Sequence, residues 1–236
     1  MILITRPKEE SQNLSEKIRD LGYDSHIEPL SKIILKKINI KFKKNSIYLI
    51  SSPRIVEVMI KNFSQTKNLK LLIIGLNSSE KIKNANFKNI IFTAKNSNEL
   101  ISYLKSSYIK SIEYLTGSIR TNNLCKQINR LDIKLNLQIV YETKFKKSLS
   151  KKCQNLIINR EIAYVLIYST ANAKHLIRLL RETNLEQEAK HIIYMCLSRN
   201  IARELIKEGF LTRYSETPTE LGLLKKLQKV EKNRKN

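Results

Sequence analysis

The chain has 236 residues, of which 42% are hydrophobic and 28% are charged. This composition is typical of a globular protein and excludes an intrinsically disordered chain, and the length suffices for one large domain or two small ones. No apolar run approaches the roughly 20 residues that span a bilayer, and the N-terminal segment MILITRPKEE becomes polar too early for a signal peptide. We therefore expect a cytoplasmic protein with no membrane partner.

The formal net charge of +23 allows two interpretations. It can indicate a polyanionic partner, either nucleic acid or a small molecule with many carboxylates or phosphates. It can also reflect compositional drift, because Lys, Ile and Asn are abundant at the expense of Ala, Gly and Arg. Lysine is spread over nearly every segment, and no zinc-finger spacing or RNP-like motif occurs. The sequence thus favours drift over a nucleic-acid partner, while an acidic ligand could use part of the charge.

Metal and cofactor signatures are missing from the sequence. The cysteines are Cys125, Cys153 and Cys196, and the histidines are His26, His175 and His191. The cysteines form no CxxC pair, which predicts reduced thiols, and the histidines do not have metal-ligand spacing, which favours structural roles. GxGxxG, Walker, GxSxG and HExxH motifs are missing too. We therefore expect no metal and no cofactor.

Apolar runs alternate with segments of helical periodicity along the chain. Strands are expected at 2–5, 47–51, 71–75, 89–93, 112–116, 137–142, 163–169, 191–196 and 210–215. Helices are expected near 8–21 and 53–63, and after each later strand except 137–142. This alternation predicts an α/β fold, with parallel sheets covered by helices on both faces.

The chain also contains an internal repeat. Four pairs of segments match in the same order, namely 4–21 with 115–131, 28–33 with 139–144, 50–60 with 167–177, and 96–100 with 217–221. Loose similarity between any two α/β stretches is the alternative explanation. The shared order favours duplication, with residues 1–110 and 111–236 as two copies of one β/α unit.

The turns between strands and helices carry capping residues. Ser52 is a good N-cap, and Pro53 suits the first position of a helix. Ser169 matches Ser52 in the repeat and should cap the equivalent helix. Thr217 to Glu220 has the spacing of a capping box, and so has Asn96 to Glu99. Such turns lie at the carboxyl ends of strands, where ligands bind in open α/β sheets and where helix N-termini favour anions. They could receive several carboxylates of one ligand, or they could simply cap helices.

The chain resembles the uroporphyrinogen-III synthase family. The resemblance rests on ordered blocks that cover nearly the whole chain: ILITRP, ISSPRIVEVMI, IVYET, YSTANAKHLI, SRNIAREL and SETPTELGLLKKL. It implies two similar parallel-sheet, flavodoxin-like α/β lobes joined by a two-stranded linker. One lobe would comprise residues 1–33 with 145–236 and the other 36–138. The linker strands would lie at about 28–35 and 139–144.

The resemblance also implies an activity. Members of this family are lyases of haem biosynthesis that cyclise hydroxymethylbilane, a linear tetrapyrrole with four acetates and four propionates. They invert the last pyrrole ring, release water and use no cofactor or metal. A cytoplasmic monomer that makes transient contact with hydroxymethylbilane synthase is what the resemblance leads us to expect.

Site residues are implied by the matching positions. Tyr141 in IVYET matches the tyrosine expected to help the substrate hydroxyl depart. Substrate-binding positions are expected at Thr5, Arg6, Ser52, Arg54, Ser169 and Asn200. A phenol keeps its proton at neutral pH, because its ordinary pKa is about 10, and it can donate a hydrogen bond to a leaving oxygen.

The chain departs from the family pattern at two turns. In LSRNIAREL, Ser198 stands where glycine is expected, and Asn200 and Ile201 stand near expected threonines; of these, Asn200 can still cap a helix. In YSTAN, Thr170 replaces the usual proline. These changes leave open a divergent active enzyme, a non-catalytic tetrapyrrole- or anion-binding protein, and a basic nucleic-acid-binding α/β protein.

Overall fold

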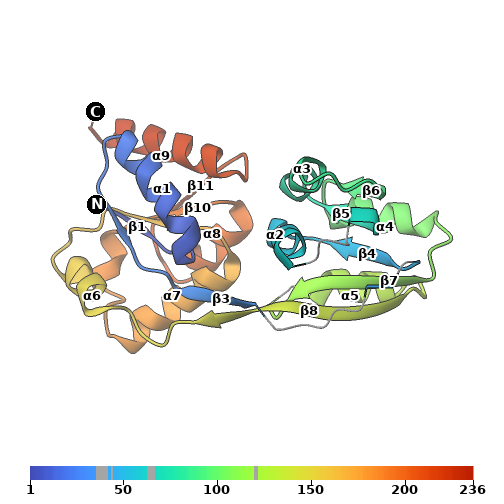
Figure 1. Ribbon diagram of the computed structural model, residues 1–236. Coiled ribbons are helices and arrows are strands. Elements are labelled where there is room, and N and C mark those ends of the chain that lie inside the picture. The colour runs from blue at the N-terminus through green and yellow to red at the C-terminus, as the bar shows by residue number, and fades with distance from the viewer. Residues whose placement is uncertain (36–41, 44, 63–66, 120–121, 236) are drawn as a thin grey trace. The chain divides into compact units, whose positions relative to one another are not determined.

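The computed structural model describes residues 1–35, 42–43, 45–62, 67–119 and 122–235 (Figure 1). The chain divides into two compact units. The first unit consists of Met1–Lys32 with Lys144–Asn236, and the second of Ile33–Thr143. Both ends of the chain therefore belong to the first unit.

Among the described residues, the first unit has a five-stranded sheet with the order β11-β10-β9-β1-β2, and all its pairs are parallel. The strands are β1 (Ile2–Ile4), β2 (Ser25–Ile27), β9 (Tyr164–Ile167), β10 (Ile193–Cys196) and β11 (Thr212–Tyr214). The helices are α1 (Lys8–Asp20), α6 (Lys151–Ile158), α7 (Thr170–Glu182), α8 (Arg199–Ile206), α9 (Glu220–Lys235) and the 3-10 helix η2 (Glu188–His191). Apolar residues of α1 and α9 form one core cluster with the sheet, and those of α6, α7 and α8 form another. The sheet is thus covered on both faces.

The second unit has a six-stranded sheet, among the described residues, with the order β3-β8-β7-β4-β5-β6. The strands are β3 (Ser31–Leu35), β4 (Ile47–Ile50), β5 (Lys70–Ile74), β6 (Ile90–Ala94), β7 (Ser111–Gly117) and β8 (Lys134–Phe145). The helices are α2 (Pro53–Asn62), α3 (Leu76–Asn84), α4 (Ser97–Lys105) and α5 (Asn122–Asn129). Helices α2 and α3 pack in one core cluster and α4 and α5 in a second. The strands from β8 to β6 pair in parallel, so the α/β class is confirmed.

The two sheets share one strand order. Reading β2-β1-β9-β10-β11 in the first unit gives the same sequence of connections as β8-β7-β4-β5-β6 in the second. The four matched segment pairs fall on equivalent elements, such as β4 and α2 against β9 and α7. The compact units nevertheless differ from the sequence copies 1–110 and 111–236. Each unit combines the first strand, helix and second strand of one copy with the remainder of the other.

The predicted strands are found with shifts of a few residues, but β2, α6 and the short 3-10 helix η2 were missed among the described residues. Strand β2 has only three residues, Ser-His-Ile, which is too short to show an alternating pattern. Helix α6 follows the linker directly, and its start depends on the capping side chain of Ser150. The helix expected at 53–63 ends at Asn62, and residue 63 lies outside the described residues.

Candidate active site

Tyr141 is seated against Gly117 in the second unit. The two residues are partners in the ladder between β7 and β8, where the register shifts after Thr116. A Cβ atom on Gly117 would lie 2.4 Å from Cε2 and 2.8 Å from the hydroxyl oxygen of Tyr141. The tyrosine is 7% exposed. Only glycine leaves room for the ring in this place.

Gly117 was not among the predicted site residues. The signal for it was a glycine at the end of the apolar run IEYLTG, where a strand can bulge beside an active site. The next residue continues the arrangement, because the Ser118 N–H donates to the Tyr141 carbonyl at 3.0 Å. The Ser118 hydroxyl in turn accepts from the Thr143 N–H at 3.1 Å. The backbone on both sides of Tyr141 is therefore held by this turn.

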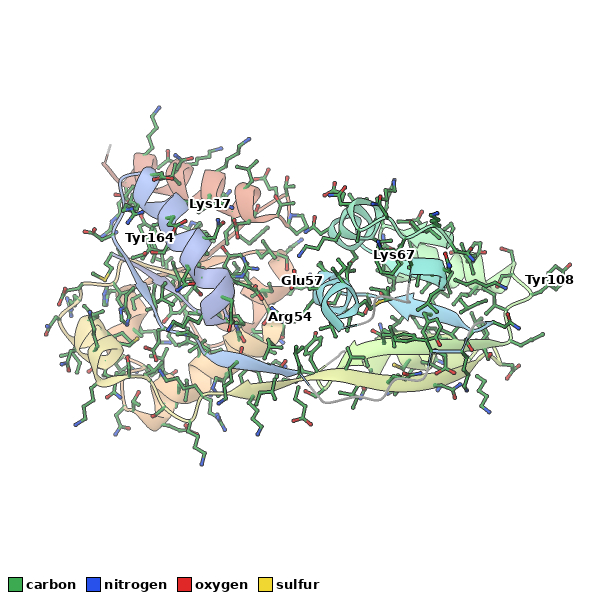
Figure 2. The ribbon with its side chains drawn as sticks, viewed as in Figure 1. Lys17, Arg54, Glu57, Lys67, Tyr108 and Tyr164 are labelled. Carbon is green, nitrogen blue, oxygen red and sulfur yellow. The ribbon has the colours of Figure 1, made fainter. Side chains whose placement is uncertain are left out.

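The turn between β4 and α2 lies at the carboxyl end of the neighbouring strand. The Ser52 hydroxyl accepts from the Arg54 N–H at 3.3 Å, and the Ser52 carbonyl accepts from the Ile55 N–H at 3.0 Å. The helix begins at Pro53, so the predicted cap is confirmed. The Arg54 guanidinium carbon lies 5.7 Å from the centre of the Tyr141 ring. Figure 2 labels Arg54 at the start of this helix. Predicted residues Ser52, Arg54 and Tyr141 thus gather at one edge of the second sheet.

In the first unit, the equivalent turn places Ser169 at the start of α7. The Ser169 hydroxyl accepts from the Asn172 N–H at 3.1 Å, which confirms the expected cap. The Asn172 side chain is buried and donates to the Thr5 carbonyl at 3.5 Å. Thr5 itself is fully buried, and its hydroxyl donates to the Leu166 carbonyl at 2.7 Å. The Thr5 side chain therefore serves the sheet and is not presented to a ligand.

Arg6 is already paired. Its guanidinium bonds the carboxylates of Glu10 and Glu220, the latter at 2.7 Å. It also lies over the Tyr168 ring, 4.4 Å from the centre. Burial raises the pKa of the Tyr168 hydroxyl, which has no well-aligned hydrogen-bond partner among the described residues. Arg6 thus offers a ligand less charge than its residue type suggests.

Two sequence-based capping predictions are wrong. Asn200 is the second residue of α8 and is exposed, while Ser198 occupies the cap position without a side-chain bond. The Asn200 side-chain oxygen accepts from Arg203 at 3.3 Å instead. In α9 the cap is Thr219, whose hydroxyl accepts from the Gly222 N–H at 3.1 Å. The capping box at Thr217 fails because the helix starts at Glu220, whose carboxylate pairs with Arg6 and Lys17.

A buried ionic cluster ties together the two chain segments that lead to the second unit. The Glu28 side chain is 3% exposed. It pairs with Lys146 and accepts from the Ser150 N–H at 3.0 Å and the Ser150 hydroxyl at 2.6 Å. Burial by itself raises the pKa of Glu28. The hydrogen bonds from Lys146 and Ser150 lower that pKa by more, so the net shift is downward. His26 lies 3.7 Å from this carboxylate, and burial lowers the pKa of its imidazole.

Across the described ranges, no group of three or more His, Cys, Asp or Glu residues is arranged to hold a metal ion. The three cysteines are free thiols. No helix in the described part of the chain is long and apolar enough to span a bilayer.

Comparison with known proteins identifies the family. The family model described as uroporphyrinogen-III synthase HemD matches residues 12–225. The crystal structure of uroporphyrinogen-III synthetase from Helicobacter pylori aligns with a TM-score of 0.68 at 13% identity, over 97% of this chain and 98% of that chain. A mutant uroporphyrinogen III synthase from the extremely thermophilic bacterium Thermus thermophilus aligns with a TM-score of 0.68 at 10% identity, over 99% of both chains.

No curated protein matches the sequence. At such low identity the two structural alignments establish the fold, whereas the family model covers most of the chain. The predicted resemblance is therefore confirmed, and the chain belongs to the uroporphyrinogen-III synthase family.

Proposed function

We propose that this protein converts hydroxymethylbilane into uroporphyrinogen III, with Tyr141 acting on the departing hydroxyl group. Family membership supports the reaction. The observation that supports this role for Tyr141 is its seat on Gly117, at the strand edge that also carries Ser52 and Arg54. The chain has ten tyrosines, so Tyr141 is assigned this role because of its position and not because of its residue type.

The proposed chemistry needs one positioned proton donor. The Tyr141 phenol transfers its proton to the hydroxyl oxygen as the carbon–oxygen bond breaks, so water leaves and a phenolate remains. The resulting methylene cation is delocalised into its pyrrole, and the last ring attacks it through the α carbon that carries the neighbouring methylene bridge, which gives a spiro intermediate. The bond from that α carbon to the old bridge then breaks, the bridge re-forms at the other α carbon of the inverted ring, and the proton lost from that carbon returns to the phenolate. A positioned acid contributes typically about 10²–10⁴-fold to such a step. The remaining task is to orient the cation and shield it from water.

Substrate carboxylates are proposed to bind at two helix N-termini. At α2 the Ser52 hydroxyl and the Arg54 guanidinium offer donors and positive charge at the positive end of the helix dipole. At α7 the Ser169 hydroxyl and the backbone N–H groups of the first turn offer donors at the equivalent position. Thr5 is left out because its hydroxyl is bonded within the sheet, and Arg6 because two carboxylates already neutralise it. Asn200 is left out because its side chain bonds Arg203.

The proposed enzyme is a cytoplasmic monomer that works without a cofactor. We further propose that it takes hydroxymethylbilane through transient contact with hydroxymethylbilane synthase. This contact would shorten the time in which free substrate closes unaided to the type I isomer.

A second candidate is a non-catalytic tetrapyrrole-binding protein. The turn before α8 supports it, because Ser198 makes no side-chain cap and Ile201 is buried where the family pattern has a hydroxyl residue. That protein would bind hydroxymethylbilane without changing the ratio of isomers formed.

The two candidates are separated by the isomer ratio in a coupled assay. Porphobilinogen and hydroxymethylbilane synthase supply the substrate, and the oxidised porphyrins are resolved by chromatography. We expect the type III isomer to predominate with the protein present and the type I isomer without it. Formation of type I alone, with or without the protein, would overturn the proposed activity, and binding under those conditions would support the second candidate.

A further inference from the structure

Five lysines line the edge of the second sheet where its parallel strands begin. Lys134 is the first residue of β8, Lys110 precedes β7, Lys43 precedes β4, Lys70 is the first residue of β5, and Lys88 precedes β6. We call these residues the lysine edge. All five are exposed. Since the order of the strands is β8-β7-β4-β5-β6, the five lysines lie at or just before the starts of five neighbouring strands.

Backbone contacts fix this neighbourhood. The Lys134 N–H donates to the Lys110 carbonyl at 2.9 Å. Lys70 is the ladder partner of Ile47, the first residue of β4. Neighbouring strands lie about 4.8 Å apart, so five strands spread the lysines over roughly 19 Å. Glu113 pairs with Lys43 at 3.5 Å and is the acidic partner seen on this edge among the described residues.

The fold itself does not require such an edge, and the first unit provides the comparison. The turns into its equivalent strands, taken as the four preceding residues and the first strand residue, carry Asp24, Arg160, Glu161, Lys190 and Glu208. The corresponding described positions in the second unit carry Lys43, Lys67, Lys70, Lys88, Lys110, Arg130 and Lys134, with Asp132 as their acid. Compositional drift acts on the whole chain, so it does not explain basic residues gathered on one of two equivalent edges.

An exposed aromatic ring and a pocket lie on the same edge. Tyr108 is 97% exposed, and Figure 2 shows its side chain projecting from the end of the second unit. A pocket of about 740 Å³ is lined by Tyr108, Lys43 and Lys110. The hydroxyl residues Ser46, Ser106, Ser107 and Ser111 line it as well. The site thus combines cations, hydroxyl groups and a free ring face.

We propose that the lysine edge binds single-stranded nucleic acid, with phosphates on the lysines and a base stacked on Tyr108. Basic tracks beside exposed aromatic rings bind single strands in this way, because every base has a face that can stack. A duplex fits less well, because its bases are already stacked on one another and leave no free face for the Tyr108 ring. An acidic protein would satisfy the lysines but gives no specific use for the tyrosine ring.

The affinity should depend steeply on salt. For single strands, log K falls with log salt concentration with a slope of about −0.7 per phosphate neutralised. Five lysines therefore predict a slope of about −3.5, which is roughly a hundredfold loss of affinity between 50 and 200 mM NaCl. Removing two lysines should reduce the slope to about −2.1.

The test measures fluorescence anisotropy of labelled twelve-nucleotide oligo(U) and oligo(dT) with the full-length protein. We expect Lys110→Gln/Lys134→Gln to weaken binding and flatten the slope. The control Lys225→Gln/Lys229→Gln removes the same charge from exposed lysines of α9 and should leave both quantities unchanged. Tyr108→Ala should weaken binding about 5- to 160-fold at an unchanged slope, since stacking contributes about 1–3 kcal/mol per base. The ratio of the two oligonucleotide affinities tells RNA from DNA.

Three results would overturn the proposal. One is equal weakening by the edge pair and the control pair, which would indicate net charge alone. Another is an unchanged affinity of Tyr108→Ala. The third is equal competition by poly-L-glutamate and by oligo(U) at the same number of charges. None of these variants touches Tyr141, so type III formation should persist in all of them, and the outcome is independent of the enzymatic proposal.

Discussion

The Tyr141 ring occupies the space that any side chain on Gly117 would need. A Cβ atom on Gly117 would lie 2.4 Å from Cε2 of that ring, well inside van der Waals contact. The missing side chain of Gly117 therefore allows the ring to lie in this position. A residue with no side chain becomes a positioning residue for the proposed proton donor.

We expect Gly117→Ala to displace the tyrosine ring and to lower turnover to type III product at least about tenfold. This bound lies below the roughly 10²–10⁴-fold that a positioned acid contributes, because water or other groups can partly replace it. Overpacking should cost about 1–3 kcal/mol of stability, so circular dichroism and urea unfolding must show that the variant is folded. If the glycine acts through Tyr141, the double variant Gly117→Ala/Tyr141→Phe should be no slower than Tyr141→Phe. A folded Gly117→Ala enzyme with normal turnover would show that the ring position is immaterial.

Ser169 should contribute to both stability and binding. Ser169→Ala removes a helix cap and should cost about 1 kcal/mol of unfolding free energy. It should also raise the apparent Michaelis constant about two- to tenfold, the worth of one net hydrogen bond. Asn96→Ala is the matched control, because Asn96 caps α4 through the same kind of bond at 3.1 Å and is not in the proposed site. Equal Michaelis constants for the two variants would show that Ser169 caps the helix and does not bind substrate.

Glu28 should make stability depend on pH. Its pKa is lowered in the folded protein, so the stabilisation is present above the ordinary carboxyl range and is lost as pH falls through the folded-state pKa. Glu28→Gln should cost about 1–3 kcal/mol at pH 7, because bonds to a buried carboxylate are lost. The difference between wild type and variant should shrink in acid, as measured by urea unfolding at pH 7 and near pH 3.

Glu57→Gln is the control for this measurement. Glu57 pairs with Lys81, and both side chains are about half exposed, at 48% and 44%. Exposed pairs are worth about 0–1 kcal/mol, so this variant should change stability little at either pH. A Glu28→Gln penalty that stays constant from pH 7 to pH 3 would contradict an ionised Glu28 as the source of the stabilisation.

The repetitive part of the fold could be predicted because each element carries its own signal. Each of the caps Ser52, Asn96 and Ser169 lies within a few residues of the apolar strand before it and the helix after it. Local patterning is therefore enough to predict these elements. The prediction of the α9 cap was wrong because two threonines, Thr217 and Thr219, are both suitably placed to cap the helix. The choice of Thr219 depends on how tightly Gly222 approaches the Thr217 carbonyl, which a Cβ atom would meet at 2.4 Å.

The candidate site was harder to predict because its contacts are long-range. The sequence alone suggests that the Thr5 hydroxyl is available to a ligand. In the structure β9 lies beside β1, and the Leu166 carbonyl accepts the hydrogen bond of this hydroxyl. The sequence alone suggests that Arg6 is a free cation. In the structure it pairs with Glu220 of α9, which lies near the other end of the chain. Gly117 gains its meaning only from the register between β7 and β8. Each of these depends on partners that sequence spacing does not reveal.

The central claim is that this chain closes hydroxymethylbilane to the type III isomer through the Tyr141 hydroxyl. The most direct test is a single-turnover reaction with protein in excess over purified hydroxymethylbilane, quenched over time and analysed for both isomers. Wild type should form type III faster than spontaneous closure forms type I, and Tyr141→Phe should do so at least about tenfold more slowly with its fold intact. Type I formed at the spontaneous rate by wild type would contradict the activity. Equal type III rates for wild type and Tyr141→Phe would contradict the role of the tyrosine.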